Sequence, residues 1–154
     1  AYAETHMKTI EREMKELIAA DSNICRNYKL LTSIKGVGPI TAIVMLCSTL
    51  NFTKITDHRK FACYCGLAPF EHSSGTSVRG GCHTSSMANR DIKVQLNRSA
   101  LIAIRCDPQL KAYYERKVAE GKHKFSVLNA VRAKIAARCF AVVRRGTPYV
   151  ALQI

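Results

Sequence analysis

The first thirty residues alternate apolar and polar positions with a heptad spacing. Charged side chains fill the outer positions, and the inner set is Ala3, Met7, Ile10, Met14, Leu17, Ile24, Tyr28 and Leu31, interrupted once by Asp21. This spacing predicts a protruding helix over residues 1–29. Two uses stay open: an amphipathic helix packed on its own domain, or the end of a coiled coil through which copies form a dimer or higher homo-oligomer. Because the pattern is already running at residue 1, we expect the C-terminal piece of a longer protein.

Residues 30–46 combine two apolar helical segments with a turn that contains Gly36 and Gly38. Glycine permits the left-handed backbone of a tight turn, and Pro39 suits a first helical turn because its missing N–H is no loss there. The segment predicts a helix-hairpin-helix, whose free N–H groups at the second helix start bind a DNA phosphate beside Lys35. A purely structural turn between two helices is the alternative.

The remaining periodic segments predict a mainly α fold, a small helical bundle over residues 30–154. We expect a short helix from an N-cap at Asp57 to Cys65, and longer helices at 89–106, at 108–121 after an N-cap at Asp107, and from about 126 to 146. The last helix has an apolar stripe at spacings of three and four, formed by Leu128, Val131, Ile135, Cys139 and Val142.

Between Glu71 and Asn89 the apolar pattern gives way to a segment rich in glycine and hydroxyl side chains. A loop of this length in a compact domain is usually functional or disordered. Part of it fits a short β-hairpin, with strands 76–78 and 82–84 around Gly80 and Gly81. Ser74 precedes a glycine, so a small nucleophile sits at a sharp turn near the planar guanidinium of Arg79. Serine–glycine pairs are also common simply as turn formers.

The distribution of charge along the chain indicates more about function than the overall composition does. The 154 residues carry a formal net charge of +13, and 47% of them are apolar, which excludes a disordered basic tail. Residues 1–50 hold six basic and five acidic side chains, whereas residues 51–154 hold eighteen and six. This excess favours a polyanionic partner, most often nucleic acid. No run is long enough for a membrane span and no signal peptide is visible, so we expect a cytoplasmic protein.

The last helix concentrates the positive charge, since no acidic residue follows Glu120. Lys134, Arg138 and Arg145 fall on one face because seven and eleven residues are close to whole numbers of helical turns. Solvated faces normally mix both signs, so a face of one sign favours phosphate contact. We expect nucleic-acid binding to depend on salt, with Lys134 and Arg138 each contributing about one unit to the slope of log K against log salt. Arg90, on the helix predicted at 89–106, is a further candidate for nucleic-acid contact.

Seven cysteines and no secretory signal favour reduced thiols over a disulfide framework. Cys63 and Cys65, with His72, Cys82 and His83, form an imaginable zinc set. A zinc knuckle usually has two or more residues between its cysteines, so buried free thiols are the preferred interpretation and no metal site is assigned.

The order of these motifs resembles the C-terminal, serine-bearing domain of bacterial insertion-sequence transposases of family 110, the DEDD-type, Piv-like transposases and recombinases. The motifs are residues 34–42 (IKGVGPITA), residues 61–69 (FACYCGLAP), Ser74-Gly75, Ala88-Asn89 and the basic helix that follows. The resemblance runs from about residue 30 to residue 149. Each motif is weak alone, and the ordered set carries the likeness.

The resemblance implies a function and a site. In that family a serine at the serine–glycine position attacks DNA, which points here to Ser74, with Ser73 as the fallback and Arg79 as the phosphate-stabilising candidate. An upstream RuvC-like domain supplies the acidic ligands for a divalent metal (Mg²⁺), so this piece needs no cofactor of its own and is expected to be inactive alone. The family also implies an element-encoded guide RNA as a partner besides DNA, in a bacterial, nucleoid-associated setting.

Two rival functions stay open. A non-catalytic helix-hairpin-helix module binds nucleic acid through the same positions, Lys35, Gly36 and Gly38, without using the serine. A basic RNA-binding scaffold is the third possibility. Binding alone does not separate the first two, because both need a basic surface and phosphate contacts.

Overall fold

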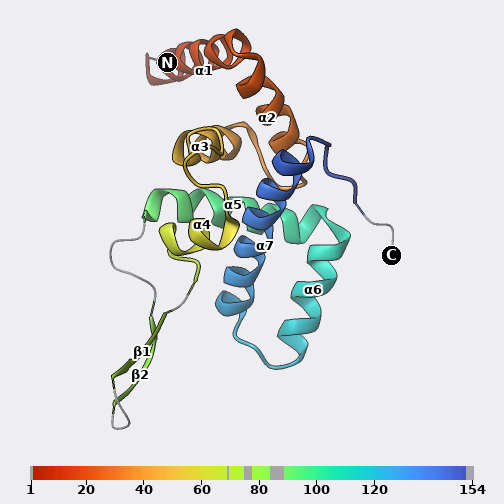
Figure 1. Cartoon of the computed structure of the whole chain (residues 1–154). Coiled ribbons are helices and arrows are strands. Elements are labelled where there is room, and N and C mark those ends of the chain that lie inside the picture. The colour runs from red at the N-terminus through yellow and green to blue at the C-terminus, as the bar shows by residue number, and fades with distance from the viewer. Residues whose placement is uncertain (1, 69, 75–77, 84–88, 152–154) are drawn as a thin grey trace.

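The computed structural model describes residues 2–68, 70–74, 78–83 and 89–151, and for the two strands it describes the backbone alone. The helices in the described part are α1 (Tyr2–Ala20), α2 (Ser22–Thr32), α3 (Pro39–Thr49), α4 (His58–Tyr64), α5 (Arg90–Cys106), α6 (Pro108–Ala119) and α7 (Lys124–Arg145). One hairpin joins β1 (Phe70–Ser74) to β2 (Val78–His83). The predicted mainly α fold is confirmed, and the hairpin extends away from the helical body (Figure 1).

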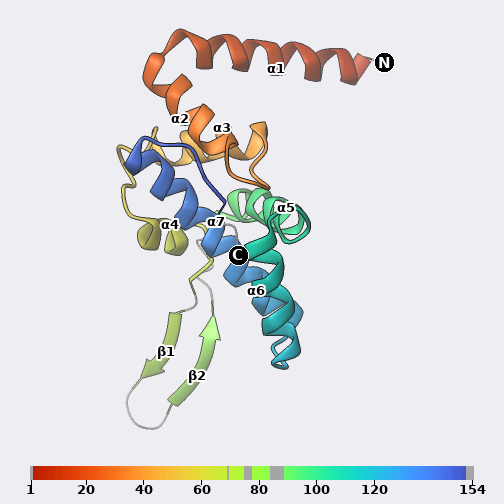
Figure 2. The same cartoon turned by 90° about the vertical axis from the view of Figure 1, so that its right-hand side faces the viewer.

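The prediction of one helix over residues 1–29 is wrong. The helix breaks at Asp21, whose carboxylate accepts hydrogen bonds from the N–H groups of Asn23 (2.8 Å) and Ile24 (3.0 Å) and so caps α2. The polar residue that interrupted the heptad therefore ends the first helix and starts the second. Figure 2 shows α1 turning sharply away from α2. Among the described elements α1 contacts only α2, and none of its residues is buried.

The core is built around α7, which packs against α2, α4, α5 and α6 and runs through the middle of the body (Figure 1). All members of the predicted apolar stripe are buried: Leu128, Val131, Ile135, Cys139 and Val142. The predicted N-caps at Asp57 and Asp107 are also confirmed. No helix of the described residues has the length and apolarity that crossing a membrane requires.

The predicted helix-hairpin-helix is present as α2, a turn and α3, but its two glycines differ. Gly36 has φ +93° and lies against α5, where an added Cβ would come 2.7 Å from the backbone oxygen of Ser99 and 2.8 Å from Cβ of Ala103. Gly38 is the N-cap of α3, and an added Cβ there would meet nothing within 4 Å. Gly36 is therefore a packing position, and Gly38 lies at the open start of the second helix.

These two glycines make a matched pair for a stability test. We expect Gly36→Ala to lower the free energy of unfolding by about 2–4 kcal/mol, because it combines a disfavoured backbone conformation with overpacking against α5. Gly38→Ala should cost at most about 1 kcal/mol, since the site is open and its φ of −88° suits any residue, which leaves only the poorer N-cap preference of alanine. Urea unfolding of both variants checks this. Equal effects at both positions would contradict the packing role of Gly36.

Asp107 joins three parts of the fold. It is 1% exposed, and one carboxylate oxygen caps α6 by accepting from the Leu110 N–H at 2.9 Å. The other oxygen accepts from Arg138 of α7 (2.9 Å) and from the Tyr149 hydroxyl (3.0 Å). Burial alone would raise the pKa of Asp107, but the Leu110 hydrogen bond, the Arg138 charge and the Tyr149 hydrogen bond outweigh it and lower that pKa.

Candidate functional site

The hairpin carries the three residues predicted to be catalytic. Ser73 lies opposite Arg79, and Ser74 ends β1 opposite Val78. The predicted strands 76–78 and 82–84 are wrong, because Gly80 and Gly81 lie within β2 instead of forming the turn. Residues 75–77, which include the glycine after Ser74, lie outside the described residues. Ser74 is thus at the end of the hairpin that is distant from the helices (Figure 2).

Helices α5 and α7 hold the root of the hairpin. The Lys93 ammonium donates to the Gly66 carbonyl at 2.9 Å, and the Asn129 side-chain amide donates to the Leu67 carbonyl at 2.9 Å. On the return side the Asn89 N–H donates to the Tyr64 carbonyl at 3.0 Å. In the described residues neither strand contacts a helix. The hairpin is therefore attached to the body through its root.

The turn between α2 and α3 presents an exposed Lys35 beside Gly38, the open N-cap of α3. No side chain caps this helix, and Pro39 occupies its first position. The N-terminus of a helix carries a partial positive charge, so this turn has the features of a phosphate site. Gly36 was predicted to belong to the same site, but it faces α5.

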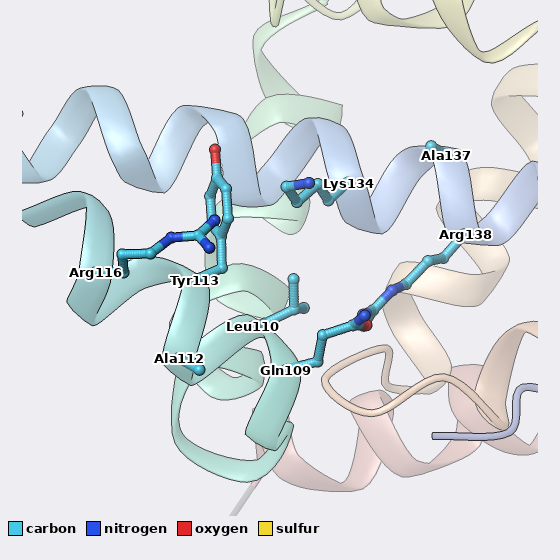
Figure 3. A pocket seen from close by; sticks show the side chains of 8 residues that line it. All are labelled: Gln109, Leu110, Ala112, Tyr113, Arg116, Lys134, Ala137 and Arg138. Atoms are coloured by element: carbon cyan, nitrogen blue, oxygen red, sulfur yellow. The ribbon is translucent and has the colours of Figure 1, made fainter. Parts of the chain in front are cut away.

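A groove between α6 and α7 contains the predicted residue Lys134. Its ammonium lies 4.4 Å from the centroid of the Tyr113 ring, and the Arg116 guanidinium lies 5.9 Å from the same centroid. Figure 3 shows both side chains directed toward Tyr113, with Arg138 farther along α7. The groove has a volume of about 730 Å³. It offers two cations and one aromatic ring to a ligand.

Arg138 is not the free cation that the sequence predicted. Its side chain is 16% exposed, pairs with Asp107 at 2.9 Å and donates to the Gln109 side chain. Its guanidinium also lies 4.7 Å from the centroid of the Tyr149 ring. The helical spacing correctly placed Arg138 on one face with Lys134, but it could not predict that Arg138 pairs with the buried Asp107 carboxylate. Lys134 and Arg145 of the same face are exposed.

Arg90 lies in a second basic pocket, of about 400 Å³, between the first turns of α5 and the start of α7. Lys93 and Arg132 line the same pocket. The structure therefore places Lys35 at the α2–α3 turn, Lys134 and Arg138 in the α6–α7 groove, and Arg90 in this pocket beside the hairpin root. Arg79 belongs to β2, and Arg145 lies in the last turn of α7.

A family model described as "Transposase IS116/IS110/IS902 family" matches residues 28–115, which is more than half of the chain. The chain belongs to this transposase family. The match covers the end of α2, the turn and α3 of the helix-hairpin-helix, the β1–β2 hairpin that carries Ser74, α5 and most of α6.

Curated relatives agree with this assignment. An insertion element IS110 protein of Streptomyces coelicolor is 39% identical over 121 residues, which cover 78% of this chain and 29% of that protein. The pilin gene-inverting protein of Moraxella bovis is 23% identical over 141 residues, covering 91% of this chain and 44% of that protein. A probable family 20 transposase of Pseudomonas aeruginosa is 28% identical over 103 residues, 67% of this chain and 29% of that protein. The chain thus spans less than half the length of these relatives.

The cysteines of this transposase-family chain do not gather into a metal site in the part that the structure describes. Cys65 is fully buried, its thiol donates to the Phe61 carbonyl at 3.0 Å, and burial raises its pKa to about 11. A protonated, buried thiol is a poor zinc ligand. Three further members of the imagined zinc set, His72, Cys82 and His83, have side chains that lie outside the described residues.

Sequence reasoning missed two contributors to the site. Asn129, which follows Leu128 in α7, holds the hairpin root, and a single asparagine in a helix gives no signal of this contact. Phe125 lies in the first turn of α7 and lines the Arg90 pocket. Its position between Lys124 and a largely basic helix was the available signal, because aromatic residues among cations are typical of nucleic-acid surfaces.

Proposed function

We propose that this chain is the DNA-binding, serine-bearing part of a longer transposase, in which Ser74 breaks and rejoins DNA strands during transposition of an insertion sequence. The observation that carries the proposal is the position of Ser74 at the outer end of a hairpin rooted between basic helices. Relatives named as a transposase and as a pilin gene-inverting protein support a role in DNA rearrangement.

The proposed chemistry is transesterification. The Ser74 hydroxyl oxygen attacks the phosphorus of a DNA phosphodiester, a phosphoserine bond forms, and the strand whose phosphorus–oxygen bond breaks leaves with a free hydroxyl after taking up the serine proton. Attack on the phosphoserine by a hydroxyl of another strand reverses these steps and joins that strand. Arg79, at the level of Ser73, is proposed to stabilise the negative charge on the phosphate oxygens.

No group of acidic, histidine or cysteine side chains that suits a metal ion occurs in the described residues. The Mg²⁺ that the family resemblance implies is therefore assigned to an upstream RuvC-like domain. We accordingly propose that this chain alone does not catalyse strand exchange.

The test uses the full-length protein and radiolabelled DNA that carries an element end. Denaturing electrophoresis should reveal a covalent protein–DNA species, and peptide mapping should place the nucleotide on the peptide that contains Ser74. A covalent link on another residue, or strand exchange without any covalent species, would replace this mechanism. Binding without exchange or adduct in the complete protein favours the non-catalytic helix-hairpin-helix module.

DNA binding is tested separately through its salt dependence. Lys134→Ala should lower the slope of log K against log salt by about 0.9 unit, because one phosphate contact is lost. Arg138→Ala should act mainly on folding, since this guanidinium is paired with a buried carboxylate. Fluorescence anisotropy at several salt concentrations, with urea unfolding of both variants, checks the contrast. If the wild type and Lys134→Ala have equal salt-dependence slopes, the α6–α7 groove does not belong to the DNA-binding interface.

Two further partners belong to the proposal. A guide RNA is proposed to share the basic surface with DNA. A second copy of the chain is proposed to cover α1, because its apolar side chains Met7, Ile10 and Leu17 are all exposed and none of the residues of this helix is buried. The division at residues 29 and 30 stays a prediction, and α2 continues across it.

A further inference from the structure

The pocket that contains Arg90 has an unusual lining. Three cations, two apolar side chains and one amide surround a volume of about 400 Å³: Arg90, Lys93, Arg132, Val94, Phe125 and Asn97. No carboxylate belongs to the lining. Among the described residues none of the three cations forms an ion pair. The pocket is therefore positively charged and partly apolar at once.

Phe125 presents its ring to solvent. It is 72% exposed, although an exposed aromatic ring leaves a large apolar surface in water. The His123 ring stacks on one side of it, with 5.6 Å between centroids and 30° between planes. Val94, across the pocket, is 49% exposed. The ring is thus supported by one neighbour and remains open to another flat group.

The cations around this ring lack anions. Nε of Arg132 is buried and has no hydrogen-bond partner in the described residues, and partial burial lowers the pKa of this guanidinium. Arg90 is exposed at the first turn of α5. A cation that has lost water without gaining an anion is stabilised by a phosphate, and the guanidinium group binds phosphate through parallel N–H bonds.

We propose that this pocket binds one unpaired nucleotide of a nucleic-acid strand, with the base stacked on Phe125 and the adjoining phosphates on Arg90 and Arg132. A paired base is not available for such stacking, because its faces are covered by its neighbours in the duplex. Single-strand sites combine a basic path for the backbone with aromatic rings for the bases. The inference rests on the proposed function only in taking nucleic acid as the partner.

The pocket adjoins the root of the serine hairpin. Lys93 lines the pocket and also donates to the Gly66 carbonyl, just before the hairpin. Arg90 follows Asn89, which caps α5 and donates to the Tyr64 carbonyl on the outgoing side of the hairpin root. A nucleotide bound here therefore lies at the root of the hairpin whose far end carries Ser74, so the pocket would hold a separated strand at the base of the serine-bearing element.

The test measures binding of three probes of one sequence: single-stranded DNA with a central 2-aminopurine, the corresponding RNA, and duplex DNA. Phe125→Leu should weaken binding of a single strand by about 5- to 100-fold and abolish the 2-aminopurine quenching, which follows from the usual contribution of one stacked base. Duplex affinity should change by less than about twofold. Phe125→Trp should retain single-strand binding, because it restores a stacking surface.

Tyr2→Leu is the matched control, since Tyr2 is an exposed aromatic on α1, away from the pocket. It should leave all three affinities unchanged. The nucleotide pocket is overturned if Phe125→Leu leaves single-strand affinity unchanged, or if it lowers single-strand and duplex affinity equally. Neither result would contradict DNA binding by the chain. Failure of the wild type to bind any probe would instead contradict the proposed function. A loss confined to DNA or to RNA supports the pocket and identifies its strand.

Discussion

Ser74→Ala in the full-length protein should reduce strand exchange by about 10⁴-fold or more, because removing the nucleophile of a covalent mechanism costs factors of this size or larger. The same substitution should leave the free energy of unfolding unchanged, since Ser74 ends a strand of a hairpin that contacts no helix of the described part. DNA affinity should also stay within about twofold. The measurement is the rate of strand joining on element-end DNA, with binding measured in parallel.

Ser73→Ala is the matched control for the nucleophile. Both serines belong to β1, but Ser73 lies opposite Arg79 whereas Ser74 lies opposite Val78. We expect Ser73→Ala to retain the covalent adduct and to lower the rate modestly. If Ser73→Ala abolishes exchange while Ser74→Ala does not, the fallback serine is the nucleophile. If strand exchange survives in the double variant, neither serine is the nucleophile, and both residues serve only to form the turn.

Asp107→Ala should lower the free energy of unfolding of the chain by about 3–5 kcal/mol. It leaves the largely buried Arg138 guanidinium without its carboxylate, removes the cap of α6 and deprives the Tyr149 hydroxyl of its acceptor. Loss of one partner of a buried ion pair is costly because the other charge remains desolvated. Urea unfolding at neutral pH gives the value.

Asp57→Ala separates the cap from the ion pair. Asp57 caps α4 in the same way, through the Arg59 N–H, but its side chain is exposed. This substitution should therefore cost only about 1 kcal/mol, the usual effect of losing an N-cap. Equal costs at Asp57 and Asp107 would show that the Arg138 and Tyr149 contacts add nothing.

The pH dependence of stability gives a second measurement on Asp107. Because its pKa is lower in the folded chain than in the unfolded one, its contribution is fully present above the unfolded carboxyl pKa of about 4 and is lost as pH falls through the lower folded pKa. Asp107→Asn should be less stable than the wild type at neutral pH, and the difference should shrink below about pH 4. A difference that is constant with pH would contradict the lowered pKa.

Helical periodicity and capping chemistry predicted the body of the fold well, because both are local. The apolar stripe of α7 from Leu128 to Val142 and the N-caps at Asp57 and Asp107 were predicted correctly from the local sequence. At Asp21 the helical periodicity gave the wrong prediction. The heptad count treated it as an interruption, whereas its carboxylate formed a cap that ended one helix and began another.

The site was less predictable because its contacts join distant parts of the chain. Spacing alone placed Arg138 with Lys134 on a basic face, and only the folded chain brings Asp107 and Tyr149 to it. The hairpin was expected, but glycine content suggested the turn at Gly80 and Gly81, whereas the strands pair around residues 75–77. Ordered motifs were the stronger guide to function, since the family they indicated is the one to which the chain belongs.

The hairpin root has a consequence for the accuracy of joining. Lys93 and Asn129 hold the two carbonyls from which the hairpin leaves the body, and Ser74 lies at its other end. A small tilt at the root moves the far end of a long, narrow element by much more than it moves the root. Under the proposed mechanism, the choice of which phosphodiester meets Ser74 is therefore sensitive to side chains at the hairpin root, and errors in the position of joining would arise from changes there without any change at the serine.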